Sequence, residues 1–166
     1  MPAGSTYSTI ATTTTSGSQV SVTFNSFSGY TDLVLVVTAK DNNGGLDGTA
    51  NLTFNGDTAA NYSTTYLFGT GSTAGSVRVT NSSQTPVLVT GSTANNFGTT
   101  IVQIMNYSNA TTFKTLLSRG NSAESAAAAR VGMWRNTAAI TSLTATAAGG
   151  SWVNSSTFTL YGISCA

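Results

Sequence analysis

The fold is set by one stretch of the sequence, Leu33-Val34-Leu35-Val36-Val37-Thr38-Ala39. This stretch is apolar nearly throughout and rich in β-branched residues, which is typical of a strand covered on both faces. Its unbroken apolar part is only five residues long, whereas a membrane-spanning helix needs about 20. We therefore expect the central strand of a β-sheet and no membrane partner.

Shorter strand signals lie on both sides of this stretch. Val20-Ser21-Val22-Thr23-Phe24 alternates apolar with polar residues, as a half-buried strand does. Residues 52–54 run into Asn55-Gly56-Asp57, where Asn-Gly supplies the positive φ angles of a tight turn. Further candidate strands are residues 64–68, 77–80, 87–90, 100–107, 112–118, 139–145 and 156–163. About ten strands between polar turns predict an all-β fold, an antiparallel β-sandwich of jelly-roll type.

One segment, residues 121–130, fits a helix as well as a strand. Asn121 is a suitable N-cap, Glu124 stands three residues later, and alanine occupies positions 126–129. This combination favours a short helix. One or two helical turns are therefore an alternative to a strand here.

Length and composition indicate one domain. The 166 residues are 40% apolar, which is enough to fill a hydrophobic core. We expect residues 19–166 to form a single β-sandwich domain. The Thr/Ser-rich residues 1–18 are expected to form an N-terminal arm, either mobile or docked on a neighbour.

The charge pattern argues against nucleic acid as a partner. Charged residues make up only 7% of the chain, against roughly 25% in ordinary globular proteins. Phosphate binding needs several basic side chains acting together, but the six present are scattered: Lys40, Arg78, Lys114, Arg119, Arg130 and Arg135.

The single cysteine, Cys165, excludes an intrachain disulfide. The first residues have no secretory signal pattern, so export by that route is not expected.

The residues needed for catalysis are scarce. Histidine, the commonest general base and metal ligand, is absent from the sequence. The acidic residues each have an ordinary explanation in a turn, a loop or a cap: Asp32, Asp41, Asp47, Asp57 and Glu124. We therefore predict that the protein is not an enzyme and has no catalytic residues, cofactor or metal.

Four residues are candidates for contact with a ligand or partner: Asp41, Asn43, Asp47 and Trp152. The first three belong to a loop whose oxygens and glycines superficially resemble a calcium loop, but Leu52 stands at the twelfth position where an EF-hand needs Glu. A hairpin tip is the favoured interpretation. Trp152 follows a Gly-Gly loop, where an exposed indole would stack on a sugar. A Trp folded over the edge of the sandwich is favoured over that.

Several segments together resemble a domain of structural proteins of tailed bacteriophages. They span nearly the whole chain, and their order and spacing carry the likeness: residues 2–7, 30–37, 54–57, 61–63, 104–109, 113–119, 134–135 and the closing Ser156-Thr157-Phe158-Thr159-Leu160-Tyr161-Gly162-Ile163. Residues 121–130 depart from this pattern.

The resemblance implies a β-sandwich displayed on a virus particle that is assembled in the host cytoplasm. The expected role is a capsid decoration protein or a tail-appendage subunit, forming a trimer or another symmetric oligomer. Its partners would be the major capsid protein or tail proteins. The alternative is a carbohydrate-binding module of a tail fibre that recognises a host surface glycan through Trp152 and the loop at residues 41–47.

The strand prediction at residues 33–39 is testable with Leu35→Asp. This change places a charge in the middle of the expected central strand, and an unpaired buried charge costs more than a domain of this size tolerates. We expect the variant not to fold, as judged by circular dichroism and solubility. A soluble variant with unchanged unfolding would show that the strand is not central.

Overall fold

The computed structural model describes residues 6–42, 48–90 and 96–164. Within these ranges the chain forms strands and no helix, so no helix is long and apolar enough to cross a membrane. The strands are β1 (Tyr7–Thr14), β2 (Ser21–Asn25), β3 (Asp32–Ala39), β4 (Gly48–Phe54), β5 (Tyr62–Gly69), β6 (Ala74–Ser82), β7 (Thr85–Thr90), β8 (Gly98–Ile104), β9 (Lys114–Ser122), β10 (Ala126–Trp134), β11 (Ser142–Thr146) and β12 (Thr157–Ile163).

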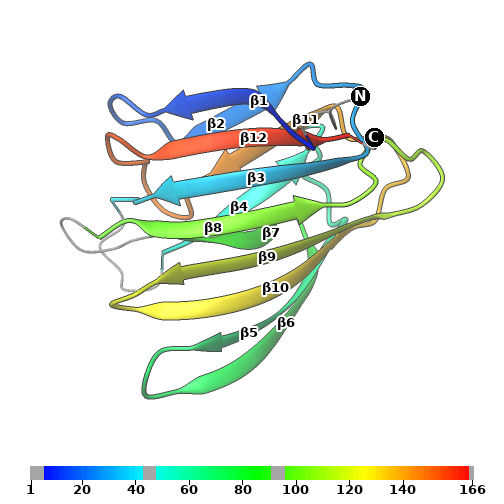
Figure 1. Cartoon of the computed structure of the whole chain (residues 1–166). Helices are drawn as coiled ribbons and strands as arrows, with labels where there is room; N and C mark the ends of the chain where they lie inside the picture. The colour runs from blue at the N-terminus through cyan, green and yellow to red at the C-terminus, as the bar shows by residue number, and fades with distance from the viewer. Residues whose placement is uncertain (1–5, 43–47, 91–95, 165–166) are drawn as a thin grey trace.

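The strands form two antiparallel sheets of unequal size (Figure 1). The large sheet has the order β1-β12-β3-β8-β9-β10-β5-β6, and the small sheet has the order β2-β11-β4-β7. The strands β1-β12-β3-β8 facing β2-β11-β4-β7 have the strand order of an eight-stranded jelly roll. Two inserted hairpins, β5–β6 and β9–β10, extend the large sheet. The predicted antiparallel sandwich of jelly-roll type is confirmed.

The core lies between the two sheets. Leu33, Leu35 and Val37 point from β3 into it and are fully buried. They meet apolar side chains of the small sheet, among them Leu52, Phe54 and Leu143 in one continuous cluster. The other face of β3 is only partly covered, since Val34 is buried and Val36 is half-buried. The stretch is an interior strand, as expected, but it is not covered by a second sheet on both faces.

The small sheet reaches farthest under the large one at β7, which packs against β8, β9 and β10. Hydroxyl groups make polar links at this contact. The Oγ1 atoms of Thr64 and Thr85 share a hydrogen bond of 2.7 Å, and Ser118 Oγ donates to the carbonyl oxygen of Val87 at 2.8 Å. These buried polar groups are thereby satisfied where the two sheets meet.

Two expectations about local structure are wrong. Part of the expected N-terminal arm, residues 7–14, is strand β1, which pairs with β12 at one edge of the large sheet. The helical alternative for residues 121–130 is also wrong: β9 ends at Ser122, a turn closed by the Ser125 N–H on the Ser122 carbonyl follows, and β10 begins at Ala126. Pairing with β9 and β5 on both sides outweighs the high helix propensity of alanine.

Gly132 of β10 gives a test of the contact between the sheets. A Cβ atom there would lie 2.8 Å from Thr85 Oγ1 and 2.9 Å from Leu116 Cδ1, and both neighbours are buried. Overpacking of this kind costs about 1–3 kcal/mol. We expect Gly132→Ala to lower the free energy of unfolding by that amount in denaturant titrations.

The matched control is Gly69→Ala in β5, where a Cβ would meet nothing within 4 Å. We expect its stability to stay within about 0.5 kcal/mol of the parent protein. Equal effects of the two substitutions would contradict the close approach of β7 to Gly132.

Candidate interaction surface

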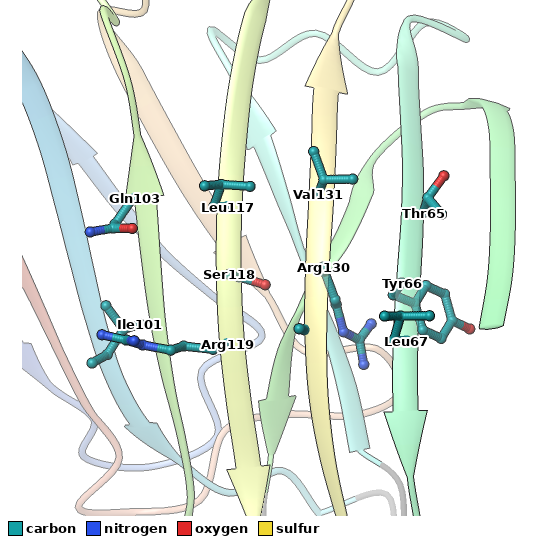
Figure 2. Close-up of a pocket in the computed structure, with 11 residues that line it drawn as sticks. Thr65, Tyr66, Leu67, Ile101, Gln103, Leu117, Ser118, Arg119, Arg130 and Val131 are labelled. Carbon is teal, nitrogen blue, oxygen red and sulfur yellow. The ribbon is translucent and has the colours of Figure 1, made fainter. Parts of the chain in front are cut away.

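The outer face of the large sheet, which points away from the small sheet, holds a shallow hollow of about 580 Å³ across β8, β9, β10 and β5. We call it the outer trough. Figure 2 shows side chains from these strands projecting on its open side. The side chains that face it are Thr65, Leu67, Ile101, Gln103, Leu117, Arg119, Ala129 and Val131.

Strand register brings these side chains together. One row across the sheet is Gln103, Leu117, Val131 and Thr65, and the next row is Ile101, Arg119, Ala129 and Leu67. Because alternate residues of a strand face opposite sides, both rows lie on one face. The adjacent rows of the opposite face point toward the core.

Large aliphatic side chains are unusually exposed in the outer trough. Leu67 is 63% exposed, Leu117 is 45% exposed and Val131 is 42% exposed. A single exposed apolar residue needs no explanation, but a contiguous group of them is typical of a surface that meets another molecule. The sequence carries a signal for this: Leu116 and Leu117 are adjacent in a strand, so one of the two must face outward.

The outer trough carries little charge. Of the described side chains on its open face, Arg119 alone is charged, and Figure 2 shows it reaching from β9 toward Ile101 of β8. Among the described residues that line it, none is acidic. Covering such a face desolvates one guanidinium group, the Gln103 amide and the Thr65 hydroxyl, and no carboxylate among the described residues.

Arg130 lies on the opposite side of the same sheet and is buried beneath the outer trough. Its Nη1 donates to the carbonyl oxygen of Pro86 at 2.8 Å, and its Cζ lies 4.6 Å from the centroid of the Tyr66 ring. Desolvation lowers the pKa of this guanidinium, while Tyr66 opposes that effect. Because these contacts attach β7 to β10 and β5, we assign Arg130 a structural role.

The candidates from the sequence lie elsewhere. Asp41 and Trp152 are each 1% exposed and face one another in an isolated antiparallel bridge. The indole packs edge-on against Phe158, with 4.9 Å between ring centroids. The alternative of an exposed Trp152 is therefore wrong, and the favoured interpretation, a Trp folded into the edge of the sandwich, is correct. Asn43 and Asp47 lie outside the described residues.

The carboxylate of Asp57 is held by hydrogen bonds that stabilise the fold. Burial alone would raise the pKa of Asp57, but hydrogen bonds to its carboxylate outweigh this and lower the pKa. The donors include the Asn61 side chain at 2.9 Å and the Trp134 indole at 2.7 Å. Within the described ranges, no three residues of the metal-binding types His, Cys, Asp and Glu cluster together.

Comparisons with protein families, curated proteins and solved structures find no match to this chain.

The buried hydroxyl of Tyr62 predicts loss of stability in alkali. It donates to the Asp57 carbonyl at 3.0 Å and accepts from the Phe54 N–H at 2.9 Å. Burial raises its pKa from 10.0 to about 12. The folded state thus favours the neutral phenol, so this stabilisation is complete below pH 10 and is lost as the pH rises toward 12.

We expect the free energy of unfolding to fall over this window by up to about 2 kcal/mol from Tyr62 alone. Urea titrations at several pH values measure the loss, and the tyrosinate absorbance reports the late ionisation. Tyr62→Phe is the control, because a phenyl ring cannot ionise. An equal alkaline loss in this variant would assign the effect to other groups.

Proposed function

We propose that this chain is a non-enzymatic structural component of a tailed-phage particle, displayed on its exterior as a capsid decoration protein or a tail-appendage subunit. The observation that carries the proposal is the outer trough, an aliphatic and nearly uncharged sheet face that no described element covers. Such a face suits attachment to another protein of the particle. The resemblance of the sequence to phage structural proteins is the reason for proposing a phage particle.

The architecture supports the same role by analogy. Jelly rolls recur in viral capsid and lectin domains, although a fold alone does not fix a function. Among the described residues the core is one continuous cluster of buried side chains, which stabilises the fold through packing. A particle component must be stable in this way, since it persists outside the cell.

The carbohydrate-binding alternative loses its main support. Stacking on a sugar needs an exposed aromatic face, but the Trp152 indole is packed against Phe158 inside the sandwich edge. The outer trough offers aliphatic side chains instead of an aromatic platform. Attachment to a protein therefore fits the described surface better than recognition of a host glycan.

The test is to locate the protein on the particle. Mass spectrometry and cryo-electron microscopy of purified particles give its copy number: hundreds of copies would identify a capsid decoration protein, and a few tens or fewer would identify a tail part. Absence from particles would overturn the proposal.

A pair of matched variants tests the attachment surface. Val131→Asp puts a charge in the outer trough, and Val20→Asp makes the same change at a valine 55% exposed in a different part of the molecule. We expect Val131→Asp to fold and to be lost from particles, with Val20→Asp retained. Retention of both variants would place the attachment surface elsewhere.

A further inference from the structure

Each β-sheet has two edge strands, and their free N–H and C=O groups can pair with another chain unless the edge is protected. The edges here are β1 and β6 in the large sheet and β2 and β7 in the small sheet. Proteins protect such edges by shortness, proline, bulges and charged side chains. The four edges differ in how many of these devices they carry.

Three edges are protected. In β1 the register with β12 shifts at Ile10, which forms a bulge, and in β7 there is a shift at Val87 next to Pro86. β2 is only five residues long. Bulges bend and twist a strand, and proline lacks the N–H needed for pairing, so these edges are poor templates for another strand.

β6 is the exception. It is nine residues long, contains no proline, and pairs with β5 without a shift from Ala74 to Val79. Its register shift lies beyond Val79, near its end. Within the described residues it has a strand partner on one side only, and it lies at the margin of the large sheet, beyond the small sheet (Figure 1).

The one charge on β6 does not protect the edge. The Nε atom of Arg78 donates to Thr65 Oγ1 at 3.4 Å, so the side chain lies back over β5. On the core-side face, Val77 is 38% exposed, and the tip of the Phe68 ring leans over Gly75 at a distance of 2.9 Å from a Cβ built there. Apolar groups therefore lie beside the open backbone.

We propose that β6 pairs with β6 of a second copy of this chain, in an antiparallel arrangement about a twofold axis at Val77. An unprotected edge is complementary to another such edge, and β6 is the one the described part of the chain offers. In this register Val77 lies opposite its own copy and Arg78 lies opposite Ser76, which avoids facing like charges. Val79 lies opposite Gly75, beside the Phe68 ring. The large sheets of two copies become one, and the isologous contact closes at two copies.

The inference concerns self-association and does not depend on the phage assignment. Sedimentation of the purified full chain measures it. We expect a particle of twice the chain mass of 16.9 kDa. Hydrogen exchange should show protection of the Ala74–Val79 amides that increases with protein concentration.

The test variant is Val77→Lys, which places a charge at the twofold axis, and Ser76→Lys is a second variant on the opposite face of β6. Each is expected to sediment at the mass of one chain with circular dichroism unchanged. Leu67→Lys, on the neighbouring strand and in the outer trough, is the matched control and is expected to remain a dimer. A monomeric or trimeric parent protein, a dimer that survives both β6 variants, or dissociation by Leu67→Lys alone would overturn the proposal.

Discussion

The contact between β7 and strands β8, β9 and β10 determines much of the rest of the structure. A small sheet of four strands must cover a large sheet of eight, and β7 is the strand that reaches under the inserted hairpins. Hydrogen bonds from Ser118 and Arg130 to β7 carbonyl groups, and the bond between Thr64 and Thr85, make this contact partly polar. Gly132 leaves the room that β7 needs.

The parts of the large sheet that β7 does not cover are open to solvent. The β5–β6 hairpin extends past the small sheet, and the outer face of the large sheet has no covering layer among the described residues. Both proposed surfaces follow from this inequality of the two sheets. The outer trough suits a protein partner through side chains, whereas the β6 edge suits a second strand through the backbone.

The class of fold could be predicted from the sequence because its strands alternate in polarity and are divided by polar turns. The run at residues 33–39 was recognised because it is apolar nearly throughout and rich in β-branched residues. Strand β10 was missed because its alanines carry no β-branched or aromatic signal, and only its pairing with β9 and β5 makes it a strand. The outer trough was also missed, since its residues come from four strands, and which strands are neighbours depends on long-range pairing. For Trp152 the buried alternative was favoured over the exposed one, and it is correct. The bridge to Asp41 that buries it could not be predicted, because it joins residues far apart in the sequence.

The position of β12 has a consequence for synthesis. This last strand lies between β1, the first, and β3, so three strands far apart in sequence must assemble side by side. Contacts between distant parts of a chain form slowly, because the intervening segment loses entropy when its ends meet. On the ribosome, β1 and β3 have no strand between them until residues 157–163 have emerged. The jelly roll therefore completes its large sheet only after residues 157–163 have been translated. Until then β3, the most hydrophobic of the described strands, exposes one edge.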